Sequence, residues 1–272
     1  MKNTQIISVI NQNGGGGKTT TVINLATALA FQKKKVLVID LDPQGNATTW
    51  LGLQNNDGVK TIYDVLNGNS NFEDSIKDTK INNLKLVSSN VDLSGLEIET
   101  ASENRRAFLL KDKIENFINS SKNDFSYVFI DCPPSLSLLT VMSLVVASSL
   151  IVPLQAEFFA LEGLTQLLKT IDRIKIKLNP ELKIRGVLLT MFDRRNKLSS
   201  QVEADARKFL NEKVYQTVIP RNVRLSEAPS HGIPILVYDK LCAGSVSYSS
   251  FADEFLKQEN IFESAAWLWK ID

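Results

Sequence analysis

The chain has 272 residues, and 43% of them are hydrophobic. Its 31 Lys and Arg nearly balance its 30 Asp and Glu. Any nucleic-acid or membrane partner must therefore be held by a local patch of basic side chains. Its two cysteines and one histidine exclude a disulfide framework and metal sites that need several imidazoles. No apolar leader precedes the first apolar run and no run reaches the roughly 18 residues that span a bilayer, so we expect a cytoplasmic protein.

Short apolar runs alternate along the chain with longer stretches of helical periodicity. We expect strands at 5–10, 35–40, 84–89, 127–131, 149–155 and 184–192. Helices are expected at 18–32, 105–121, 161–178 and 199–213. Each strand is apolar on both faces, which is typical of parallel strands covered by helices. The alternation predicts an α/β fold built on a single doubly wound, mostly parallel sheet.

The chain shows no internal repeat and no Pro/Gly/Ser-rich linker, so we expect residues 1–272 to form one domain. The most polar stretch, 54–83, is interpreted as a surface excursion between strands. Residues 255–272 are expected to form a C-terminal helical tail with an apolar face of Ile261, Phe262, Ala265, Leu268 and Trp269. Its polar face is acidic apart from Lys270, which favours packing against the domain or a partner over a membrane-surface helix.

Residues 11–21 read NQNGGGGKTTT and join the first strand to the first helix. The common phosphate-loop spacing would need glycine where Gln12 stands, so the loop is a deviant one. Such glycines let backbone N–H groups turn onto phosphates, the lysine meets the β- and γ-phosphates, and the first hydroxyl reaches Mg²⁺. A plain glycine turn is the alternative, but the Lys-Thr-Thr start would then be a coincidence. We expect nucleotide to be bound by Gly14, Gly15, Gly16, Gly17, Lys18, Thr19 and Thr20.

Acidic residues end two of the predicted strands. Asp40 and Asp42 follow the second, and Asp131 ends the fourth. Because ligands of open α/β sheets bind at the carboxyl ends of strands, we expect these acids to converge on the loop. Taken alone, Asp40 and Asp42 fit a turn before Pro43 equally well. The loop upstream and Asp131 downstream favour the functional interpretation.

These motifs together resemble the ParA/Soj class of chromosome and plasmid partition ATPases. The resemblance rests on the loop, on DLDPQGNAT (40–48), on DCPPS (131–135) and on VIPRNVRLSEAPSHGIPI (218–235), and it extends to about residue 255. The last motif separates this class from septum-site MinD-type relatives. The resemblance implies that Mg-ATP drives a sandwich homodimer and that this dimer binds DNA without sequence preference on the nucleoid. A ParB-like partner would then trigger hydrolysis.

The resemblance also implies roles for individual residues. Asp42 would act on the attacking water, with Asp40 beside it near the metal, and Asp131 would hold Mg²⁺ through water. The implied set is catalytic Lys18, Asp42 and Asp40; metal-binding Thr19, Asp131 and Asp40; adenine-side Pro220, Arg221 and Asn222; and DNA-binding Arg195 and Arg224. Without the resemblance, both arginines would fit an ordinary solvated surface.

The loop departs from the family pattern NQKGGVGKTTT at two positions. Asn13 stands where the family has a lysine that reaches the partner protomer's phosphates, and Gly16 stands where valine is usual. Asparagine is neutral and shorter, so it cannot supply that charge in trans, a role comparable to an arginine finger. We therefore expect ATP to be held yet hydrolysed slowly.

Two functions stay open at this stage. One is a partition ATPase whose ATP-bound dimer binds DNA. The other is a nucleotide-gated binding module, held on DNA or on a membrane surface in the manner of MinD, with little turnover. Turnover measured with and without DNA and a ParB-like partner separates them.

Three further residues are interpreted as structural. Cys132 and Cys242 lie outside the cluster motifs of the nitrogenase iron-protein relatives, so we expect small buried apolar residues. His231 lies in a turn between Pro229 and Pro234, where we expect a structural role.

Overall fold

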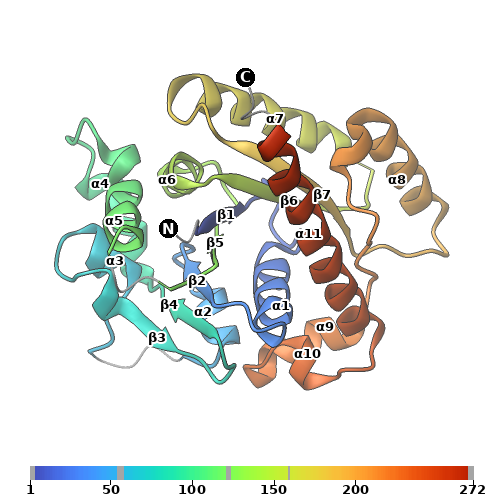
Figure 1. The fold of residues 1–272 in the computed structure, drawn as a ribbon, viewed down its shortest axis with the longest axis horizontal. Coiled ribbons are helices and arrows are strands. Elements are labelled where there is room, and N and C mark those ends of the chain that lie inside the picture. Colours follow the sequence, from blue (N-terminus) through green and yellow to red (C-terminus); the bar gives the residue numbers. More distant parts are fainter. Residues whose placement is uncertain (1–3, 54–57, 121–123, 159, 269–272) are drawn as a thin grey trace.

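The computed structural model describes residues 4–53, 58–120, 124–158 and 160–268, with side chains described as far as residue 259 (Figure 1). Seven strands form one sheet in the order β3-β4-β2-β5-β1-β6-β7. Their bounds are β1 Gln5–Val9, β2 Val36–Asp40, β3 Ile76–Asp78, β4 Leu84–Val87, β5 Tyr127–Asp131, β6 Ser149–Gln155 and β7 Lys183–Thr190. All neighbours pair in parallel except β3 and β4. The predicted doubly wound, mostly parallel sheet is confirmed, whereas the single domain stays a prediction.

Helices cover both faces of this sheet. The α-helices are α1 Lys18–Phe31, α2 Asn46–Trp50, α3 Ile62–Leu66, α4 Leu96–Glu99, α5 Leu109–Ile118, α6 Leu138–Val146, α7 Ala160–Lys177, α8 Lys197–Leu210, α9 Val223–Glu227, α10 Ile235–Tyr238 and α11 Ala243–Leu268. Short 3₁₀ helices lie at Glu73–Ser75, Val91–Gly95, Arg106–Phe108, Asn211–Lys213 and Ala228–His231. None of the helices in the described part of the chain is long and apolar enough to cross a membrane.

Alternate strand residues pack into two separate apolar layers. On one face, Ile7 and Val9 of β1 share a layer with α1, α2, α10 and α11. On the other, Ile6 of β1 and Ile39 of β2 share a layer with α3, α5, α6, α7 and α8. Figure 1 shows α1 and α11 side by side on the first face. Burial on both faces explains why the strands read as continuous apolar runs.

Several elements differ from the sequence expectations. The polar stretch 54–83 contains α3 and β3 as well as surface turns. Strand β3 (Ile-Lys-Asp) is short and polar, as edge strands often are, so it could not be recognised as an apolar run. Helix α6 is apolar all round and buried, so it lacks the amphipathic period used to recognise helices. Helix α11 begins at Ala243, well before the expected tail.

The first turn of the predicted tail packs on the domain. The Phe255 ring meets Tyr127 edge-on with centroids 5.6 Å apart, and the Arg185 guanidinium lies 3.7 Å from its centroid. Glu259 accepts a hydrogen bond from the Tyr127 hydroxyl and lies 3.8 Å from Arg185 Nη2. The backbone is helical to Leu268, while the predicted apolar face from Ile261 onward lies outside the described side chains.

Candidate functional site

The glycine loop follows β1 and leads directly into α1. Gly15 and Gly17 have φ of 73° and 88°, a left-handed conformation that glycine adopts without a Cβ penalty. Gly17 is the N-cap of α1 and has no side chain to cap it, so the first-turn N–H groups face outward without a side-chain acceptor. A helix N-terminus of this kind attracts phosphate. The predicted Gly14–Thr20 segment therefore has the local geometry that phosphate binding needs.

Lys18 lies at the base of this loop with only 7% of its surface exposed. Its Nζ donates a hydrogen bond to the Asn13 carbonyl at 3.0 Å. Burial lowers the pKa of Lys18, and the negative charges of Asp131 and Asp42 oppose that shift. A buried cation is thus held among the acids that the sequence predicted to converge on the loop.

Asp40 is occupied by hydrogen bonds to its own strand-end turn. Its Oδ2 accepts from the Thr48 N–H at 2.8 Å and the Thr48 hydroxyl at 2.7 Å, and its Oδ1 accepts from the Asp42 N–H at 3.2 Å. Burial raises the pKa of Asp40 to about 6, while the Thr48 and Asp42 bonds oppose the rise. The carboxylate therefore braces the turn that presents Asp42, while its predicted place near the metal stays a prediction.

Asp131 has the opposite surroundings, although β2 and β5 pair it directly with Asp40. Both of its carboxylate oxygens are buried and accept no hydrogen bond that meets normal geometry from any described residue. Burial raises the pKa of Asp131 well above its usual range, the Asp40 charge adds to this, and the nearby Thr19 hydroxyl and Lys18 charge oppose it. A buried carboxylate left without a donor, beside a hydroxyl, fits a hard cation that takes oxygen ligands.

Magnesium suits this donor set better than a metal that needs an all-protein cage. The described residues contain no group of three or more His, Cys, Asp or Glu placed to hold a metal ion. Mg²⁺ is usually bound through one or two carboxylates with substrate phosphates and water completing its shell. Thr19 and Asp131 would supply the protein ligands, directly or through water.

The end of β7 connects the loop to the segment predicted beside the adenine. The Thr190 hydroxyl donates to the Gly16 carbonyl at 3.1 Å. Two residues on, the Phe192 carbonyl accepts from the Arg221 N–H at 3.0 Å. Pro220, Arg221 and Asn222 are therefore brought near the loop, and Asn222 has a buried Oδ1 with no hydrogen bond from the described residues. Thr190 was not predicted, because a lone threonine at a strand end carries no motif.

The two predicted DNA-binding arginines lie on the surface and are ion-paired within the chain. Arg195, with 89% of its side chain exposed, bonds both carboxylate oxygens of Asp193 through Nε and Nη2 at 3.0 and 2.9 Å. Arg195 holds the pKa of Asp193 at about 2. Arg224 Nη1 lies 2.9 Å from Glu227, and its Nε lies 3.6 Å from Asp239. A phosphate at either arginine would have to compete with these carboxylates.

The last predicted residues to be placed are Asn13, the two cysteines and His231. Asn13 is exposed at the start of the loop, so its side chain is free to point away from its own phosphate site. Cys132 is buried as expected and its Sγ lies 3.0 Å from Ser143 Oγ, but Cys242 is only half-buried. The His231 ring stacks on Tyr238 with centroids 4.9 Å apart, in keeping with a structural role.

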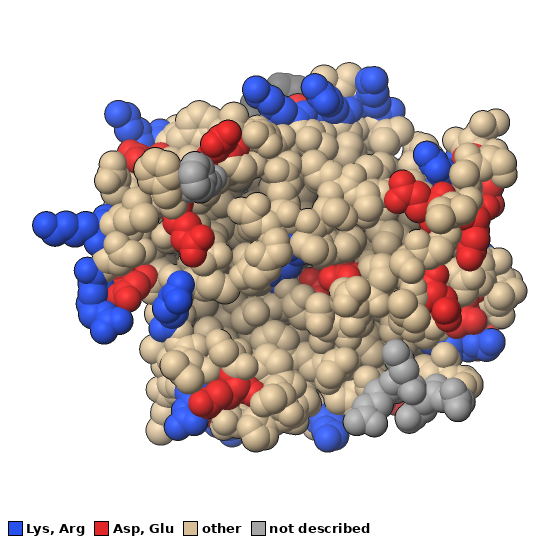
Figure 2. Space-filling model, turned by 180° about the vertical axis from the view of Figure 1, so that it is seen from behind, with Lys and Arg blue, Asp and Glu red and all other residues tan. Residues whose placement is uncertain are grey.

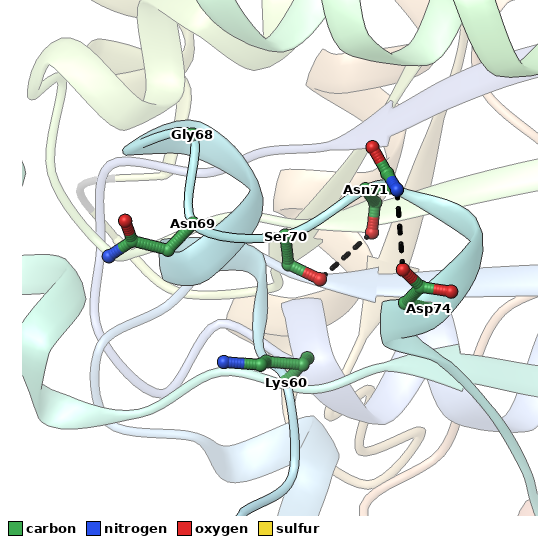
Figure 3. A pocket seen from close by; sticks show the side chains of 6 residues that line it. All are labelled: Lys60, Gly68, Asn69, Ser70, Asn71 and Asp74. Carbon is green, nitrogen blue, oxygen red and sulfur yellow. Dashed lines mark hydrogen bonds between the residues drawn. The ribbon is translucent and has the colours of Figure 1, made fainter.

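The surface has a central hollow, and small pockets lie apart from it, one of them beside Lys60. On the face opposite to Figure 1, basic and acidic side chains lie side by side at the bottom of the hollow, and other Lys and Arg are spread around the rim (Figure 2). The pocket is formed by Lys60 and the turn before β3, where Asn71 Nδ2 donates to Asp74 at 3.4 Å (Figure 3). It shares no residue with the glycine loop or the strand-end acids, so no predicted role attaches to it.

Comparisons with known proteins agree with this arrangement. A family model described as an AAA domain matches residues 4–184. Over 255 residues the chain is 50% identical to the chromosome partitioning protein ParA of Caulobacter vibrioides, covering 94% of this chain and 95% of that protein. Over 250 residues it is 46% identical to the sporulation initiation inhibitor protein Soj of Bacillus subtilis, covering 92% and 97%. The structure resembles cobyrinic acid a,c-diamide synthase from Mycobacterium smegmatis with bound ATP analogue and magnesium, with a TM-score of 0.82 and 34% identity over 93% of this chain and 94% of that one.

Proposed function

The chain belongs to the ParA/Soj family of chromosome-partitioning ATPases, and we propose that it acts as a slow, Mg-ATP-switched partition ATPase. The observation that carries the proposal is the buried Asp131 carboxylate, which has no hydrogen bond of normal geometry and lies beside Thr19 and Lys18 at the foot of the glycine loop. The geometry of this site and the family both favour Mg-ATP as its ligand. Thr19 and Asp131 would hold Mg²⁺, and the ion would supply positive charge to neutralise the phosphates.

The protein's own residues divide the work of binding and orientation. The loop N–H groups and the α1 N-terminus would hold the phosphates, and Lys18 would add the fixed cation. Asp42, presented by the turn that Asp40 braces through Thr48, would accept a hydrogen bond from the attacking water and orient it. Asp40 then serves as a positioning residue for Asp42, and the Pro220–Asn222 segment lies beside the base.

Asn13 is the reason to expect slow hydrolysis. The family's lysine at this position reaches across the dimer, and an asparagine supplies no cation there. A charge that acts mainly while the γ-phosphoryl group leaves contributes to turnover far more than to ATP affinity. ATP should therefore be retained in the site of a long-lived dimer.

Family membership supports DNA and a ParB-like protein as partners. Arg195 and Arg224 would contact phosphates in the ATP-bound homodimer, which would locate the protein on the cytoplasmic nucleoid. Phosphate contacts carry no base information, so binding would be insensitive to sequence and would weaken steeply with salt. A ParB-like partner would supply the trigger for hydrolysis.

Light scattering with each nucleotide tests the central step. Mg-ATP should shift the chain from monomer to dimer while Mg-ADP should not, and Lys18→Ala should abolish the shift because the site loses its buried cation. Lys169→Ala removes an exposed lysine of α7 and serves as the matched control. The same mass with both nucleotides would refute the proposal.

Asn13 also favours a second candidate, a nucleotide-gated module on DNA or a membrane surface that switches by exchange with almost no turnover. ATP turnover should therefore be measured alone, with DNA, and with DNA and a ParB-like partner. Stimulation by the pair supports the partition ATPase, whereas a flat rate supports the exchange-driven module.

A further inference from the structure

The Asn11 side chain ties the glycine loop to β6. Its Nδ2 donates to the Pro153 carbonyl at 2.7 Å, and its Oδ1 accepts from the Asn13 N–H at 3.1 Å. A carbonyl can only accept and a backbone N–H can only donate, so these partners determine which way round the amide lies. Loss of the side chain would break both bonds.

The hydrogen bond to Pro153 extends the pairing of β1 and β6 with a side-chain donor in place of a backbone donor. The two strands pair in parallel as far as Val9 and Ile151, and the Ile10 N–H donates to the Ile151 carbonyl at 3.1 Å. Residues two apart on a strand face the same neighbour, so the Pro153 carbonyl is the next acceptor on that side. Asn11 supplies a side-chain donor where the β1 backbone has turned away into the loop.

The same side chain acts on Lys18 through one intermediate residue. Asn11 holds the Asn13 N–H, and the Asn13 carbonyl accepts from Lys18 Nζ at 3.0 Å. Both backbone polar groups of Asn13 are thereby held. Three consecutive hydrogen bonds connect β6 to the buried cation of the nucleotide site.

The Asn11 amide, in its present place, leaves no room for a side chain at position 16. A Cβ built on Gly16 would lie 2.6 Å from Asn11 Nδ2, which is closer than real Cβ atoms come to a neighbour, so the Asn11 amide would have to move. Gly16 does not have the left-handed φ of Gly15 and Gly17, so space rather than backbone conformation excludes a side chain. The Asn11 amide can withdraw only by giving up its bonds to Pro153 and Asn13.

We propose that Asn11 is a positioning residue of the nucleotide site, and that glycine at position 16 is what admits it. Asn11 fixes the orientation of the Asn13 backbone, and the Asn13 carbonyl in turn fixes the position of Lys18 Nζ. Valine, usual at position 16 in the family pattern, would not leave room for the Asn11 amide in its present place. The inference rests on the proposed function, because its consequence is for nucleotide held by Lys18.

A double-mutant cycle on Mg-ADP affinity, measured by calorimetry, tests the inference. Asn11→Ala and Gly16→Ala should each raise the dissociation constant about tenfold, equivalent to about 1.4 kcal/mol. The double variant should be about as weak as either single one, because both changes remove the same contacts. Gly163→Ala adds a methyl to α7 where nothing lies within 4 Å, and it should bind as the parent does.

The outcomes separate positioning from plain stabilisation. Melting temperatures without nucleotide should be recorded for every variant. Lower melting temperatures with unchanged Mg-ADP affinity would reduce Asn11 to a structural residue and overturn the inference, as would additive effects of the two substitutions. A parent chain that binds no Mg-ADP would overturn the proposed function, and the inference with it.

Discussion

Replacing Asp131 with asparagine should stabilise the nucleotide-free protein while removing its response to magnesium. The carboxylate is buried without a donor and faces the charge of Asp40, so folding raises its pKa. An acid with a raised pKa binds its proton more tightly in the folded chain, so stability is highest below the usual value and falls as pH rises toward the raised one. Above that window the ionised group is a cost, and each unit of pKa shift corresponds to about 1.4 kcal/mol.

The gain is reduced by two losses, since Lys18 loses its strongest opposite charge and the new amide is itself a buried polar group. We therefore expect a net increase of about 1 to 3 kcal/mol in the free energy of unfolding near neutral pH. For a chain of this size that is roughly 2 to 5 °C in melting temperature.

Thermal melts with and without Mg-ADP provide the assay. The parent should gain about 2.7 kcal/mol at a ligand concentration of roughly 100 times the dissociation constant. Asp131→Asn should start higher and gain little from magnesium, and its decline with rising pH should be smaller than the parent's, limited to the part that Asp40 contributes up to about pH 6. Asp205→Asn, on the exposed face of α8, is the matched control. A lower nucleotide-free melting temperature for Asp131→Asn, or an undiminished response to magnesium, would refute the reasoning.

Two further predictions concern turnover and DNA. With DNA and a ParB-like partner present, Asn13→Lys should raise the rate of ATP hydrolysis by at least about tenfold and change ATP affinity little, because the added cation acts mainly in the transition state. Equal rates for parent and variant would remove Asn13 as the cause of slow turnover. Asp193→Asn should strengthen DNA binding several-fold for any duplex, because it releases Arg195 from its ion pair. Arg195→Ala should weaken DNA binding by the same factor for every duplex and reduce its salt dependence, and fluorescence anisotropy across a salt series measures both effects. Unchanged affinity in both variants would move the DNA surface elsewhere.

Local pattern in the sequence was sufficient for most of the fold. The apolar runs became β1, β2, β4, β5, β6 and β7 because a parallel strand covered on both faces needs apolar side chains on both. The glycine loop and the acid at the end of β5 could also be recognised, since each combines a rare residue pattern with a strand end. What escaped detection was β3, which is short and polar, and α6, which is apolar all round and lacks a helical period.

The chemistry of each side chain, by contrast, depended on partners that lie far away in the sequence. Asp40 and Asp131 are the same residue type at neighbouring strand ends, yet Asp40 accepts three hydrogen bonds while Asp131 accepts none of normal geometry from the described residues. Asn11 meets a carbonyl 142 residues away, and Thr190 meets the loop across 174 residues. The sequence by itself determined which groups stand at the carboxyl edge of the sheet, because that follows from local periodicity and chain order. Only the tertiary structure decided which of them are already satisfied and which remain available to a ligand, because burial and hydrogen bonding are set by contacts between segments that only folding brings together.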